Sequence, residues 1–127
     1  MGGKEMKALV ERYIEAYNAF DVEGMLALVD PGVEFKNVSN GAVTAEARGI
    51  GALRKLAEQS KALFASRRQT MTSFKGSDNE AEVALTFEAV LASDLPNGMR
   101  QGQQLRLEGR SEFSFRDGRI LRIVDLS

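Results

Sequence analysis

The sequence contains no cysteine and no histidine. Without cysteine the chain can form no disulfide, no thiolate nucleophile and no zinc site built on sulfur. Without histidine it lacks the usual general base near neutral pH and the commonest transition-metal ligand. Any acid–base chemistry must therefore use carboxylates, tyrosine, lysine or bound water. We expect neither a metal nor another cofactor.

An excess of one charge sign is also missing, because 17 basic and 18 acidic residues are mixed along the chain. This balance gives no electrostatic surface for nucleic acid, which we do not expect as a partner. Arg67 and Arg68 form an adjacent basic pair. We interpret them as residues of an edge strand or a helix end in preference to a phosphate site.

Long apolar runs are missing too, and none approaches the ~18 residues that would predict a membrane helix. The first residues, "MGGKEMKALV", show no apolar stretch followed by a small-residue cleavage site. With 127 residues, 43% of them hydrophobic and 28% charged, the chain fits one domain with one core. We expect a single cytoplasmic domain over residues 1–127 with no membrane partner.

Apolar residues near the N-terminus recur at helical spacing and predict a first helix that ends near Phe20. They are Met6, Val10, Tyr13, Ile14, Tyr17 and Phe20. Tyr13 and Tyr17 are the only tyrosines in the chain, and a buried phenol needs a hydrogen-bond partner. Their hydroxyl groups can reach water or a backbone carbonyl, or they can contact a ligand.

Two more helices are indicated. Asp21 is a good N-cap for a short helix, "VEGMLALV", which "DPG" ends. The strand "VEFKNV" follows, with Phe35 and Asn37 on one face, and we interpret "SNGAVTAEARG" as a loop. Helical spacing returns between Ile50 and Phe64.

From Arg67 onward the hydrophobic period changes to two, which predicts four strands. They are "RRQTMTSFKG", "AEVALTFEAVLAS", "QLRLEGRSEFSFR" and "RILRIVDL". "DLPNG" and the pair Asp117 and Gly118 supply turn residues. We therefore predict an α+β fold, in which three N-terminal helices pack on the concave face of a strongly curved antiparallel sheet.

Three segments carry a resemblance to a known family: "RYIEAYNAFDVEGMLAL", the "RG" at Arg48 and Gly49, and "FSFRDGRILRIVD". Over nearly its whole length the chain resembles the nuclear transport factor 2-like superfamily, especially its SnoaL-like and ketosteroid isomerase-like branch. The resemblance implies a conical α+β barrel with a pocket for a small molecule. Tyr13 matches the tyrosine of the ketosteroid isomerases, whereas Asn37 and Ser111 stand where those enzymes have acids. Steroid isomerisation by their route is therefore not implied.

Other members of the superfamily, the polyketide cyclases and a class of epoxide hydrolases, use carboxylates near the end of the final strand. Asp125 shares the face of Leu121 and Ile123, which alternation makes the inner one. We predict Asp125 and Tyr13 as catalytic residues, and Arg48 as the nearest cation. The predicted ligand contacts are Asn37, Tyr17, Ser111, Phe35, Phe87, Phe113 and Ile123.

We expect an isomerase, cyclase or hydrolase that acts on an apolar carbonyl or epoxide compound. The alternative is a non-catalytic binding or dimerisation module that kept the fold. Alternation also predicts an apolar outer face on the sheet, and such a surface usually marks an interface. It comprises Ile120, Val124, Leu126, Ala84, Thr86, Val90 and Ala92, and it predicts a homodimer.

Overall fold

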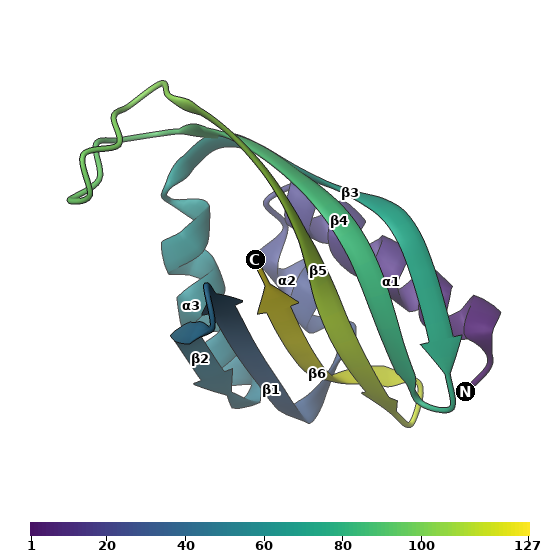
Figure 1. The fold of residues 1–127 in the computed structure, drawn as a ribbon. Helices are drawn as coiled ribbons and strands as arrows, with labels where there is room; N and C mark the ends of the chain where they lie inside the picture. Colours follow the sequence, from purple (N-terminus) through teal and green to yellow (C-terminus); the bar gives the residue numbers. More distant parts are fainter.

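Three helices and six strands build the structure, a computed structural model that describes all 127 residues from Met1 to Ser127. The helices are α1 (Gly3–Asn18), α2 (Val22–Leu26) and α3 (Gly49–Lys61). The strands are β1 (Val29–Ser39), β2 (Ala42–Arg48), β3 (Phe64–Ser77), β4 (Glu80–Leu91), β5 (Gln104–Arg116) and β6 (Arg119–Leu126) (Figure 1). The predicted change from helical to strand structure after the third helix is confirmed.

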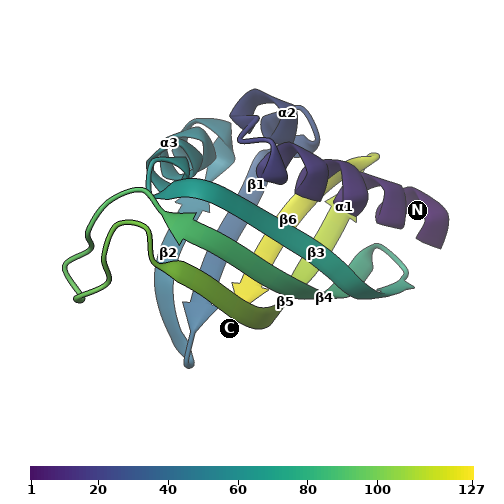
Figure 2. The same ribbon diagram turned by 90° about the horizontal axis from the view of Figure 1, so that it is seen from above.

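All six strands form one sheet in the order β2-β1-β6-β5-β4-β3. The meander from β3 to β6 is antiparallel, as predicted, but β1 runs parallel to β6 and makes the sheet mixed. Parallel neighbours need a crossover connection, which α3 and the meander supply here. The sheet curls around the helices and does not close, because β2 and β3 remain its two edges (Figures 1 and 2). The predicted conical α+β fold is confirmed.

The helices cover the concave side of the sheet (Figure 2). Helix α1 packs against β3, α3 packs against β1 and β2, and α2 packs against both other helices. Met6 and Val10, from the inward face of α1, are almost completely buried, as are Val83 and Ile120. The apolar side of the amphipathic helix α1 therefore faces the single core, as predicted. None of the three helices is long and apolar enough to cross a membrane.

The segment interpreted as a loop is instead a hairpin. Asn40 and Gly41 have positive φ angles of 52° and 80°, and β2 pairs with β1 immediately after them. An Asn-Gly pair is the sequence best suited to such a two-residue turn. The alanines and the glutamate of β2 are weak strand formers, so pairing with β1 overrides their local preference.

A register shift changes which residue of β6 faces the core. Phe115 pairs with Ile120 and Ser114 pairs with Arg122, so Leu121 has no partner on β5. Such a bulge reverses the alternation. Ile120 is consequently buried in the core, and its prediction as an outer-face residue is wrong.

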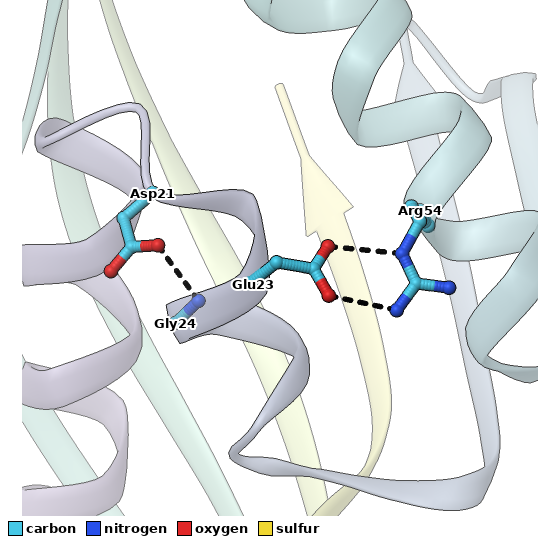
Figure 3. A network of polar contacts seen from close by, with 4 residues as sticks. All are labelled: Asp21, Glu23, Gly24 and Arg54. Atoms are coloured by element: carbon cyan, nitrogen blue, oxygen red, sulfur yellow. Dashed lines mark hydrogen bonds and ion pairs between the residues drawn. The ribbon is translucent and has the colours of Figure 1, made fainter.

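Polar contacts fix the short helix α2 (Figure 3). Oδ1 of Asp21 accepts a hydrogen bond from the backbone N–H of Gly24 at 2.9 Å, which confirms Asp21 as the N-cap. Two hydrogen bonds of 2.9 and 3.0 Å join Arg54 of α3 to Glu23 of α2. The two-pronged geometry fixes the direction of approach of the two helices.

Candidate functional site

A cavity of about 650 Å³ lies between the helices and the concave face of the sheet. It is lined by 27 residues, 15 of them hydrophobic, and every helix and every strand contributes at least one. Its volume falls in the usual range for small-molecule sites, about 300–1,000 Å³. The fold thus leaves a mostly apolar cavity between the helices and the sheet.

The cavity brings together most of the residues singled out from the sequence. Those that line it are Tyr13, Tyr17, Phe35, Asn37, Phe87, Ser111, Phe113 and Asp125. Ile123 is 1% exposed and lies in the core instead of the cavity wall. Arg48 is exposed and is not among the lining residues, so its prediction as the nearest cation is wrong. Nowhere in the chain do three or more Asp and Glu side chains converge in a way that could hold a metal ion.

Asp125 is the carboxylate of this cavity. It lies on β6 between Asn37 of β1 and Ser111 of β5, which are its partners on the two neighbouring strands. Ser111 donates a hydrogen bond of 2.5 Å from Oγ to Oδ1 of Asp125, which leaves Oδ2 without a protein partner. Burial raises the pKa of Asp125 to about 6, and the Ser111 hydrogen bond partly opposes that rise. Asp125 can therefore exchange a proton near neutral pH.

Asn37 lies beside Asp125 with part of its hydrogen-bonding capacity already used. Its Nδ2 donates to Oγ1 of Thr44 on β2 at 2.8 Å. An amide carries two N–H donors and one carbonyl acceptor. The structure thus fixes the orientation of the side chain and leaves one donor and Oδ1 without a protein partner.

The two tyrosines stand one turn apart on α1 and both face the cavity. Their rings pack edge-to-face, Tyr13 on Phe113 and Tyr17 on Phe87. The Tyr13 hydroxyl has no hydrogen-bond partner in the protein, and that of Tyr17 interacts with the guanidinium of Arg67. No fully buried polar side-chain atom lacks a partner, so the Tyr13 hydroxyl retains accessible surface in the cavity.

Both phenols stay protonated over the physiological pH range. Burial raises the pKa of Tyr13 well above its ordinary value, and the negative charge of Asp125 adds to that rise. Burial likewise raises the pKa of Tyr17 to about 12, although Arg67 opposes the shift. Each tyrosine is therefore a neutral hydrogen-bond donor directed at whatever occupies the cavity.

Arg67 also lines the cavity, although the sequence interpretation did not place it there. It belongs to the edge strand β3, as expected, but its side chain turns inward and only 6% of the residue is exposed. Strand alternation carried the signal, since Arg67, Gln69 and Met71 occupy alternate positions that are more buried than their neighbours. The sequence interpretation assigned Arg67 and Arg68 together to an edge strand or a helix end and did not separate the two by strand alternation.

The profile of the SnoaL-like domain matches residues 10–123, most of the chain. This chain belongs to the SnoaL-like family. The match confirms the resemblance carried by the first helix and the last hairpin. No curated protein sequence matches this SnoaL-like chain.

Solved structures agree in fold. AclR from Streptomyces galilaeus, a proposed hydroxylase, is 19% identical, with 98% of this chain and 89% of that chain covered and a TM-score of 0.78. A proposed polyketide cyclase from Xanthomonas campestris pv. campestris is 23% identical, with 98% and 91% covered and a TM-score of 0.78. A proposed SnoaL-like polyketide cyclase from Jannaschia sp. CCS1 is 12% identical, with 97% and 85% covered and a TM-score of 0.82. At these identities the likeness establishes the fold of this SnoaL-like protein, and its chemistry must be argued from its own residues.

Proposed function

We propose that this SnoaL-like protein binds an apolar carbonyl compound in its cavity and removes a proton from the carbon next to the carbonyl. Asp125 is the base, and Tyr13 donates a hydrogen bond to the carbonyl oxygen. Isomerisation and carbon–carbon cyclisation can both begin with this step, and cyclases are among the proposed activities of the structural neighbours.

The observation that carries the proposal is the environment of Asp125. Its carboxylate lies in a mostly apolar cavity with one oxygen bonded to Ser111 and the other without a protein partner. A carboxylate with a pKa of about 6 is mostly ionised at pH 7, yet it is a stronger base than an ordinary aspartate. Its position, its protonation state and its free oxygen all suit proton abstraction.

The proposed step balances its atoms and charges. Oδ2 of Asp125 takes the proton, and the electron pair of the broken C–H bond shifts toward the carbonyl oxygen to give an enolate. The neutral phenol of Tyr13 donates its hydrogen bond to that oxygen as negative charge develops there. Asn37 has a free N–H to support the same oxygen or a neighbouring one. Returning the proton to another atom completes an isomerisation, and attack of the enolate on a second carbonyl completes a cyclisation.

Deuterium exchange tests the proposal without knowledge of the natural substrate. The probe is 2-tetralone, a bicyclic ketone with acidic hydrogens next to its carbonyl, followed by proton NMR in D2O. We expect exchange above the buffer rate, rising with pH through about 6 as Asp125 ionises. Asp125→Asn should lower the enzyme-dependent rate by about 10² to 10⁴-fold, the usual contribution of a general base.

Tyr13→Phe is the matched variant on the oxygen side of the reaction. The hydroxyl of Tyr13 makes no hydrogen bond to the protein, so the Tyr13→Phe variant should fold as well as wild type. The rate of deuterium exchange should fall by about tenfold or more. Glu112→Gln, an exposed carboxylate on β5, is the control and should leave exchange unchanged. Equal exchange rates in wild type and Asp125→Asn would overturn the proposed role of Asp125.

A second function is a non-catalytic binding module that kept the cavity. It is favoured by one observation: of the three functional groups of the ketosteroid isomerase-like site, only Tyr13 is retained, because Asn37 and Ser111 replace the acids. Binding of 2-tetralone with no exchange above the buffer rate would support this function over catalysis.

A further inference from the structure

Arg67 is the only basic residue among the buried residues of the chain. Its Nε donates to the backbone carbonyl oxygen of Tyr17 at 3.0 Å, and the guanidinium also interacts with the Tyr17 hydroxyl. None of the four ion pairs in the molecule includes it. The guanidinium therefore has no carboxylate partner and keeps N–H donors available to a ligand at the wall of an apolar cavity.

Two aromatic rings hold this guanidinium in place. Its central carbon lies 3.7 Å from the ring centroid of Tyr17 and 4.5 Å from that of Phe20. Such contacts suit the planar, delocalised charge of arginine. The position of the cation is thus fixed before any ligand arrives, which reduces the entropy lost on binding.

Phe20 adopts a strained backbone conformation at this point. Its φ of 57° places it in the left-handed region, where helices usually end with glycine. The backbone N–H groups of Phe20 and Asp21 bond back to Tyr17 and Ala16, which closes the end of α1. A bulky residue in this conformation, with its ring on Arg67, is the kind of local strain that gathers at functional sites.

We propose that Arg67 is an anion site that binds a carboxylate group of the ligand. The inference rests on the proposed function and adds a feature to its substrate: an apolar carbonyl compound that also carries an acid. Arg67 on β3 and Asp125 on β6 are separated by two strands of the sheet, and both line the cavity that Tyr13 and Tyr17 of α1 also line. A ligand carboxylate at Arg67 would direct the other end of the molecule toward Asp125.

The competing explanation is purely structural. A cation near the C-terminus of a helix is favourable, and Nε of Arg67 satisfies a carbonyl there. That role uses one of the five N–H donors and does not account for a buried cation that has no carboxylate partner. An arginine fork is well matched to a carboxylate, which can accept two parallel hydrogen bonds.

Calorimetric titration with two probes of nearly equal shape tests the inference: 2-naphthoate, which is anionic, and 2-naphthamide, which is neutral. Wild type should bind the carboxylate about tenfold or more tightly than the amide at pH 7.5, as expected for charge-assisted hydrogen bonds. Arg67→Met should remove that preference and leave amide affinity within about twofold. Arg68→Met, the neighbouring exposed position, is the control and should change neither affinity.

Arg67→Lys is a second variant that keeps the inference testable if Arg67→Met fails to fold. It keeps the charge and loses the planar fork, so a weakened preference for the carboxylate should remain. If wild type binds both probes equally, the anion site is overturned while the proposed cavity for an apolar ligand stands. If neither probe binds wild type, the binding step of the proposed function is contradicted and the anion site with it.

Discussion

At the scale of single residues, the ionisation of Asp125 connects stability with function. Its pKa of about 6 in the folded protein exceeds its ordinary value of 3.8, so the folded state holds the proton more tightly than the unfolded state. The folded state thus binds more protons between about pH 4 and pH 6, and the free energy of unfolding falls as the pH rises through that window. Above pH 6 the buried charge of Asp125 lowers the free energy of unfolding by the full amount, on the order of 1–3 kcal/mol.

Asp125→Asn should therefore stabilise the protein at high pH only. We expect equal free energies of unfolding for variant and wild type near pH 4, and a variant more stable by about 1–3 kcal/mol at pH 8, because the buried charge is gone. Urea denaturation at the two pH values measures the difference, with Glu112→Gln as the exposed control. A gain for Asp125→Asn that is the same at pH 4 and pH 8 would contradict the raised pKa.

Which residues line the cavity was partly predictable from strand alternation. The period of two placed Asn37, Ser111 and Asp125 on inward faces, and the structure brings them side by side. Alternation failed for Ile120, because a bulge cannot be seen in a single strand's pattern. The inward position of Arg67 was not predicted, because charged side chains are usually exposed and the two aromatic rings that contact this one lie on another part of the chain.

At the scale of secondary-structure elements, Gly41 and Gly51 have equal space for a side chain and differ in backbone conformation. An added Cβ would meet no atom within 4 Å at either Gly41 or Gly51. Gly41 has a φ of 80° in the turn between β1 and β2, whereas Gly51 lies in α3. A side chain at Gly41 is therefore strained without any clash, and one at Gly51 is not.

The two alanine substitutions should change stability in opposite directions. Gly41→Ala should lower the free energy of unfolding by about 1 kcal/mol, because the left-handed conformation is costly for a residue with a Cβ. Gly51→Ala should raise it by up to about 1 kcal/mol, because alanine reduces the freedom of the unfolded chain and favours the helix. Thermal unfolding of the pair measures both, and a stabilising Gly41→Ala would refute the turn geometry described for β1 and β2.

Most elements could be predicted from local patterns, with one instructive exception. The helices and the meander follow from changes of hydrophobic period, and Asp117 and Gly118 form the short turn expected of them, with positive φ angles. Strand β2 was missed because its alanines carry little strand preference of their own. Its existence depends on pairing with β1, which is a tertiary contact, so only the Asn40-Gly41 turn signalled it locally.

At the scale of the whole molecule, the outer face of the sheet remains a proposed dimer interface. Ala84, Thr86 and Val90 of β4 are partly exposed there beside charged residues of β5, even though Ile120 faces the core. Arg106 and Glu88 already pair across the two strands at 3.7 Å, and mixed charges of this kind can also pair across a two-fold axis.

The parallel pairing of β1 with β6 could not be predicted, because it joins distant segments of the chain.

We expect sedimentation equilibrium at micromolar concentration to give twice the 13.9 kDa mass of one chain. Ala84→Glu should shift the equilibrium to monomers, because the new carboxylate would be buried between the two sheets of the dimer. The chain should still fold, because in the monomer that carboxylate lies opposite Arg110 on the neighbouring strand. A constant mass of 13.9 kDa over a tenfold rise in concentration would show that this face is not a stable interface.

The proposed function depends on the proton affinity of Asp125 in its cavity, and carbon-13 NMR of the Asp125 carboxyl group measures that affinity. The signal, assigned by its loss in Asp125→Asn, is followed from pH 3 to pH 8 with and without 2-naphthamide. We predict a midpoint near 6 in the free protein and a higher one with the probe bound, because an apolar ligand removes more water from the carboxylate. A midpoint near 3.8 that the probe does not move would show that Asp125 titrates as an ordinary aspartate and is not the base of this cavity.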